Sequence, residues 1–126
     1  MTEEKLNEYK SRLTEELVRI KADLTTIAKL NEATGDWVAI PPNVESETAD
    51  QNLEADTTEE WNERRATVAQ LETRYRNIER ALGKFEAGEY GKCEISGDEI
   101  EEKRLDANPA ARTNITNIER EGELPM

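Results

Sequence analysis

Residues 88–120 read GEYGKCEISGDEIEEKRLDANPAARTNITNIER, and this stretch decides how the whole chain is interpreted. Four of its positions have the spacing of a C-x2-C…C-x2-C metal site: Cys93, Ser96, Asn114 and Asn117. Structural zinc needs about four ligands, usually thiolates or imidazoles, and hydroxyl and amide oxygens are poor ligands for it. Because only the first position is a cysteine and the chain has no histidine, we expect no zinc to bind.

Without a metal, hydrogen bonds must tie these polar positions together, with Cys93 packed as a small apolar group. Ile95, Ile100 and Leu105 are suited to line a small core. We expect the segment to fold and to dock through four apolar side chains, Phe85, Tyr90, Ile115 and Ile118. A catalytic or redox role for Cys93 is the alternative, but Glu94 is a poor activator and no histidine is available as a base.

Two long amphipathic helices are expected before this segment. Apolar residues recur every three or four positions, which is the seam of a helix, at Leu6, Tyr9, Leu13, Leu17, Ile20, Leu24 and Ile27. With Gly35 as its stop, this pattern predicts a helix over 3–33. The pattern returns at Trp61, Val68, Leu71, Tyr75, Ile78, Leu82 and Phe85, which predicts a second helix over 50–87. Thr57 and Glu60 fit a capping box, so a start at Thr57 is equally compatible.

The segment 34–49 joins the two helices. Adjacent prolines at 41 and 42 break a helix and favour extended backbone, and we interpret the segment as a tip loop without strands. Its apolar group of Trp37, Val38 and Ile40 either pins the loop to a helix or contacts a partner.

The fold class follows from these elements. Two apolar seams joined by a short link pack best as an antiparallel hairpin. The sequence therefore predicts a mainly α protein, with a long coiled-coil hairpin over 1–88. A small zinc-finger-like module without zinc follows over 89–126 and contains a short C-terminal helix.

The charge of the chain argues against some classes of function. Nucleic-acid binders present a basic face, whereas this chain has a net charge of −12, so we expect no direct binding to nucleic acid. Residues 30–63 contain ten acidic residues and no lysine or arginine, and form either a solvated loop or a contact surface for a basic partner. No apolar stretch is long enough for a membrane span or a signal peptide, so we expect a cytoplasmic protein.

The other residues of the C-terminal stretch resemble the zinc-finger motif of the DksA/TraR family of bacterial transcription factors. The resemblance rests on Tyr90-Gly91-Lys92-Cys93, Ser96-Gly97, Glu99-Ile100 and Arg104-Leu105-Asp106-Ala107-Asn108-Pro109. It implies a coiled hairpin before the finger and a factor that binds RNA polymerase rather than DNA. Family members place the coiled-coil tip in the secondary channel of the polymerase.

The tip of that family carries an Asp-x-x-Asp-x-Ala motif. Counted without gaps from the first cysteine position, the resemblance places this motif on Asp50, Leu53 and Ala55. Leu53 replaces the second aspartate, and Glu54 and Asp56 flank it as substitute carboxylates. The implied polymerase-contacting residues are Asp50, Glu54, Ala55 and Asp56. Asp50 is equally suited to cap the second helix.

Family members often act together with the nucleotide ppGpp. The same count places Gln70, Asn77 and Asn108 where well-studied members have basic residues. Nearby cations that can hold a phosphate are Arg74, Arg76, Lys103 and Arg104, although surface or salt-bridge roles explain them as well. We therefore expect no cofactor, with ppGpp as the open alternative.

These patterns together predict a monomeric transcription regulator that binds RNA polymerase through its acidic tip and inserts it into the secondary channel. The alternative is a structural or adaptor coiled-coil protein that kept the fold but lost the activity. Self-association through the seam also stays open, since heptads pair between chains as readily as within one. We do not expect an enzyme, because the chain has no histidine, no glycine-rich phosphate loop and no nucleophile–base pair.

Overall fold

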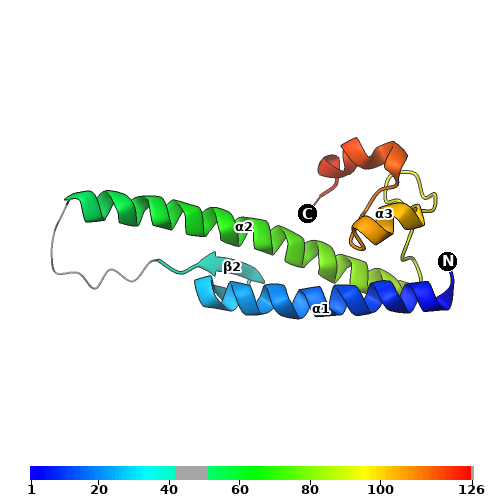
Figure 1. The fold of residues 1–126 in the computed structure, drawn as a ribbon, viewed down its shortest axis with the longest axis horizontal. Coiled ribbons are helices and arrows are strands. Elements are labelled where there is room, and N and C mark those ends of the chain that lie inside the picture. Colours follow the sequence, from blue (N-terminus) through cyan, green and yellow to red (C-terminus); the bar gives the residue numbers. More distant parts are fainter. Residues whose placement is uncertain (42–50, 126) are drawn as a thin grey trace. The chain divides into compact units, whose positions relative to one another are not determined.

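The computed structural model describes residues 1–41 and 51–125, with side chains described for 1–41 and 58–125. The fold is mainly helical, as predicted (Figure 1). Its elements are α1 (Glu3–Ile27), β1 (Ala28–Asn31), β2 (Asp36–Ala39), α2 (Gln51–Ala87), α3 (Glu102–Ala107) and the 3-10 helix η1 (Ile115–Glu123). Every residue of the two expected apolar seams is buried or half-buried. No helix in the described part of the chain has an apolar stretch that could span a bilayer.

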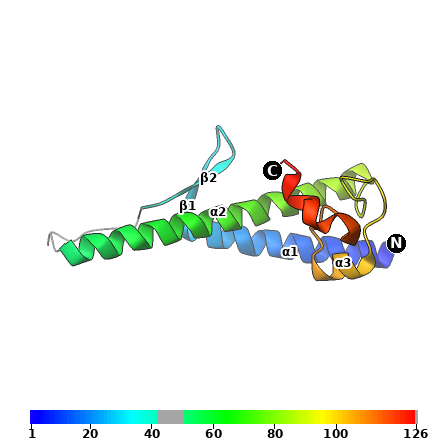
Figure 2. The same ribbon diagram turned by 90° about the horizontal axis from the view of Figure 1, so that it is seen from above.

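The expected end of the first helix is wrong, because α1 ends at Ile27 and not at residue 33. The chain continues into an antiparallel β-hairpin in which Leu30 lies opposite Trp37 (Figure 2). Gly35 does not stop a helix but turns this hairpin at a φ of 76°, a conformation that other residues avoid. Trp37 is buried in this paired strand, and aromatic residues favour strands, so its burial favours the hairpin over a continued helix.

The expectation of a loop without strands over 34–49 is therefore also wrong over Asp36–Ala39, while residues 42–50 lie outside the described part. Of the apolar group in this segment, Trp37 is buried and Val38 is 56% exposed, so the pinning interpretation holds for Trp37 and not for Val38. The backbone N–H of Ile40 donates to the carbonyl of Ile27 at 2.8 Å, and Arg64 Nη1 donates to the carbonyl of Ile40 at 3.0 Å.

Two compact units make up the structure: Met1–Arg19 together with Arg74–Met126, and Ile20–Thr73. This division differs from the boundary expected after residue 88, because both long helices contribute to each unit. The second unit buries apolar side chains from both helices and from the hairpin, namely Ile20, Leu24, Ala28, Trp37 and Val68.

The first unit contains a small core around the C-terminal segment. The core is formed by Tyr9, Cys93, Ile100, Leu105 and Ala111, with Phe85, Tyr90 and Ile95 packed against it. The rings of Phe85 and Tyr90 stack at 3.9 Å between centroids. The core positions predicted from the sequence are thus confirmed, and so are two of the four expected docking residues.

The other two expected docking residues, Ile115 and Ile118, are 49% and 43% exposed, so their predicted role is wrong. They lie on η1, which is a 3-10 helix. This helix is attached through the carboxylate of Glu121, which binds Arg104 and the backbone N–H of Arg112, rather than through an apolar face.

Candidate functional site

The structure brings all four degenerate ligand positions into hydrogen-bond contact. Asn114 caps η1 by accepting from the backbone N–H of Asn117 at 3.1 Å and from Asn117 Nδ2 at 2.9 Å. The same Nδ2 lies 3.7 Å from Cys93 Sγ. Ser96 belongs to the turn that follows Cys93, and its hydroxyl bonds to the thiol. Hydrogen bonds therefore join the two pairs of positions, as expected from the sequence.

The thiol of Cys93 is buried, and its pKa reflects two opposing effects. Burial raises the pKa of this thiol, since it disfavours the thiolate. Hydrogen bonds from the Ser96 side chain and from the backbone N–H groups of Ser96, Asn114 and Ile95 oppose it, and the pKa falls to about 7. Cys93 is therefore a hydrogen-bond acceptor at the centre of the turn, more polar than the small apolar group expected from the sequence.

The residues at these four positions do not fit a zinc ion. They offer one thiolate, one hydroxyl and two amides. Asn117 directs its nitrogen at the sulfur, and Asn114 Oδ1 already accepts two hydrogen bonds. Among the residues that the structure describes, no group of three or more His, Cys, Asp or Glu side chains is placed to hold a metal ion.

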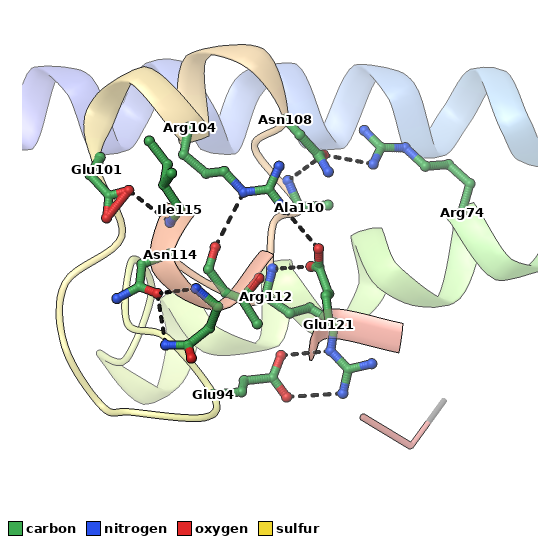
Figure 3. A network of polar contacts seen from close by, with 12 residues as sticks. Arg74, Glu94, Glu101, Arg104, Asn108, Ala110, Arg112, Asn114, Ile115 and Glu121 are labelled. Carbon is green, nitrogen blue, oxygen red and sulfur yellow. Dashed lines mark hydrogen bonds and ion pairs between the residues drawn. The ribbon is translucent and has the colours of Figure 1, made fainter. Parts of the chain in front are cut away.

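A network of ion pairs surrounds these positions (Figure 3). The carboxylate of Glu94 accepts hydrogen bonds from Arg112 Nε at 2.7 Å and Nη2 at 3.0 Å, and from Lys84 Nζ at 3.0 Å. The carboxylate of Glu121 accepts hydrogen bonds from Arg104 Nη2 at 2.7 Å and from the backbone N–H of Arg112 at 2.6 Å. Partial burial raises the pKa of Glu94, but its hydrogen bonds and charges from Arg112 and Lys84 prevail and hold it at about 2.

Sequence reasoning missed this network. From the sequence, Glu94 is weighed only as an activator of the thiol, and Glu121 is assigned no role. A signal was nevertheless present, since an acidic residue directly follows Cys93 and an arginine stands two residues before Asn114. Residues beside the two pairs of ligand positions lie close together in space, so opposite charges at those neighbouring positions predict an ion pair.

Two of the cations considered for ppGpp are engaged within the chain. Arg74 forms a bidentate ion pair with Glu16, with N···O distances of 2.7 and 2.9 Å. It also donates a hydrogen bond to Asn108 Oδ1 at 2.7 Å. This arginine lowers the pKa of Glu16. Arg104 is held by Glu121 and donates to the carbonyl of Thr113. These contacts favour the salt-bridge interpretation of Arg74 and Arg104.

The expected tip residues fall at the edge of the described structure. Asp50 lies outside the described residues, and Glu54, Ala55 and Asp56 lie in α2, with their side chains outside the described part. Because α2 begins at Gln51, these three residues are helical, which agrees with the earlier of the two possible starts. Further along α2, the side chains of Glu59, Glu60 and Glu63 are exposed.

A scan against protein-family models and a search of curated proteins found no match to the sequence. Among solved structures, the chain is similar to transcription factor DksA2 from Pseudomonas aeruginosa, with 20% identity, a TM-score of 0.73, and coverage of 98% of this chain and 87% of that one. It is also similar to the RNA polymerase binding protein and transcriptional regulator Dks from Chlamydia trachomatis, with 22% identity, a TM-score of 0.56, and coverage of 100% and 99%. The chain therefore has the fold of DksA-type transcription factors, which confirms the resemblance to the DksA/TraR family found in its C-terminal stretch.

Proposed function

We propose that this chain is a transcription regulator that acts by binding RNA polymerase directly. The observation that carries the proposal is the likeness of nearly the whole chain to two transcription factors, one of which is described as an RNA polymerase binding protein. The motifs around Cys93 point to the same family independently of the overall fold.

The polymerase-contacting surface that we propose is the acidic segment at the start of α2, with Asp50, Glu54, Ala55 and Asp56 as its central residues. In this proposal α1 and α2 form a coiled-coil hairpin whose tip enters the secondary channel. The ten acidic residues of 30–63 suit a partner surface that is basic or holds a metal ion. The exposed carboxylates of Glu59 and Glu63 extend this acidic surface along the helix.

The C-terminal module has a supporting role in this proposal. Its charged residues bind one another, and no chemistry is assigned to it. The chain acts without zinc, in the cytoplasm, as a monomer and without contacting DNA. A second candidate function, a structural or adaptor coiled-coil protein that kept the fold but lost the regulatory activity, is favoured by one observation, the leucine at position 53 in place of an acidic residue.

The test measures binding of the full chain to core RNA polymerase by fluorescence anisotropy. The variant Asp50→Asn/Glu54→Gln/Asp56→Asn should weaken binding by about tenfold or more, because three charges facing a basic surface are removed. A matched control removes the same number of charges from exposed positions of the module, with Glu99→Gln/Glu119→Gln/Glu123→Gln, and should bind as the unmodified chain does.

Two further outcomes separate the candidates. Binding that changes neither open-complex lifetime nor transcript yield in a purified transcription assay would support the adaptor. Absence of binding at micromolar concentrations would contradict the regulator and support a purely structural role. The variant Leu53→Asp sharpens the choice, since it should increase regulation if a second tip carboxylate is all that is lacking.

A further inference from the structure

The C-terminal module has to hold two segments together, 88–101 and 109–123, although its ligand positions cannot bind the metal that their spacing suggests. The side-chain donors at those positions carry no charge. Between the segments, Asn117 Nδ2 lies 3.7 Å from Cys93 Sγ, and the backbone N–H of Asn114 also donates to this sulfur, which is a weak acceptor. The short contacts between charged groups lie just beside these positions.

Glu94 provides the first of these contacts. Its two carboxylate oxygens face Arg112 Nε and Nη2 at 2.7 and 3.0 Å, the bidentate arrangement that is among the strongest hydrogen-bonded pairs in proteins. The backbone N–H of Glu94 also donates to the carbonyl of Arg112 at 2.8 Å. Lys84 adds a contact of 3.0 Å to the same carboxylate from the last turn of α2.

Glu121 provides the second contact between charged groups. One oxygen accepts the backbone N–H of Arg112 at 2.6 Å, and the other accepts Arg104 Nη2 at 2.7 Å (Figure 3). Arg104 in turn donates through Nε to the carbonyl of Thr113. A single carboxylate thus joins η1, α3 and the irregular segment that carries Arg112.

Burial separates these pairs from ordinary surface pairs. The cationic side chains of Arg112, Arg104 and Lys84 are 8%, 13% and 16% exposed, whereas the exposed pair Arg120–Glu123 is 59% and 66% exposed. Solvent screens the first group less, so removing one partner leaves a poorly solvated charge behind.

We propose that Glu94 and Glu121 cross-link the module in place of a metal ion, beside the contact of Glu101 Oε2 with the backbone N–H of Ile115 at 2.9 Å, so that its fold depends on carboxylates and not on zinc. The module is held by Arg112, which meets Glu94 through its guanidinium and Glu121 through its backbone. The proposal does not depend on how the chain acts on transcription.

The experiment uses the full chain and follows thermal unfolding by circular dichroism. Glu94→Gln and Glu121→Gln should each lower the melting temperature by roughly 10 °C, since each leaves a buried arginine without its anion. The matched controls are exposed glutamates of the same segments, Glu99→Gln and Glu119→Gln, which should change it by at most about 2 °C. A strong zinc chelator should leave the unmodified chain unchanged.

Three results would overturn the proposal. One is zinc bound stoichiometrically to the purified chain, measured by elemental analysis, together with a melting temperature that falls on chelation. Another is that Glu94→Gln and Glu121→Gln unfold at the temperature of their controls. The third is rapid hydrogen exchange of the Glu94 and Arg112 backbone amides in the unmodified chain, which would show that the cross-link does not hold. This measurement tests the proposal even where the variants fail to fold.

Discussion

The C-terminal module and the first half of α2 are both rich in charge, yet they use it in opposite ways. In the module, Glu94 and Glu121 bind cations of the chain itself, and the pKa of Glu94 falls to about 2. Along α2, Glu59 and Glu63 face solvent. Charges that are paired within the chain contribute to its stability, whereas exposed carboxylates such as Glu59 and Glu63 are suited to meet a basic partner.

The largest expected effect comes from giving the module a metal site in addition to its ion pairs. The variant Ser96→Cys/Asn114→Cys/Asn117→Cys, which keeps Cys93, should bind one zinc ion and melt at a clearly higher temperature with zinc than after chelation. Zinc binding to four thiolates contributes folding free energy directly, and the hydrogen bonds among these positions bring the side chains close enough. Elemental analysis and the absorption spectrum of the cobalt-substituted variant measure the binding.

The matched control carries alanine at the same three positions and should bind no zinc. If the cysteine variant also fails to bind metal, the four positions do not converge on one point. The contrast between a module held by carboxylates and one held by a metal would then lose its geometric basis.

A smaller effect is expected from acid. The pKa of Glu94 in the folded chain, about 2, lies below its ordinary value, so the folded state binds this proton less readily than the unfolded state. The stability contributed by Glu94 is therefore fully present above about pH 4.5 and is lost as the pH falls toward 2. Urea unfolding at a series of pH values should show this loss in the unmodified chain.

The variant Glu94→Gln isolates the contribution of this carboxylate, because other groups such as Glu16 and Asp106 also have lowered pKa values. Its stability should fall less steeply between pH 4.5 and 2 than that of the unmodified chain. Parallel curves would mean that the ion pair with Arg112 does not stabilise the fold.

The helices and the small core could be predicted from the sequence because they depend on local periodicity. Leu13 and Ile78 follow from helical spacing, Leu105 follows from its apolar character, and each is fully buried. The β-hairpin could not be predicted in this way. Its strands have four residues each, and what stabilises them, the burial of Trp37, depends on contacts distant in the sequence.

The charged network was hidden for a similar reason. Glu94 and Arg112 are 18 residues apart, and neither belongs to a recognisable motif. Comparison with a zinc site drew attention to Cys93, Ser96, Asn114 and Asn117, whereas the ion pairs lie at the neighbouring positions. In this module, whose metal ligands are missing, Glu94 and Arg112 beside the ligand positions form the ion pair.

The smallest effect on stability is expected for Glu59 and Glu63 of α2, where we propose an effect on polymerase binding. The variant Glu59→Gln/Glu63→Gln removes two exposed charges from α2 and should change the free energy of unfolding by no more than about 0.5 kcal/mol. On the proposed function, the same variant should weaken binding to core polymerase, and the loss should diminish as salt is raised, because exposed charges act over distances that salt screens. A large loss of stability in urea unfolding would contradict the view that these charges are kept for a partner. Unchanged stability with unchanged polymerase binding would limit the contact surface to Asp50, Glu54 and Asp56.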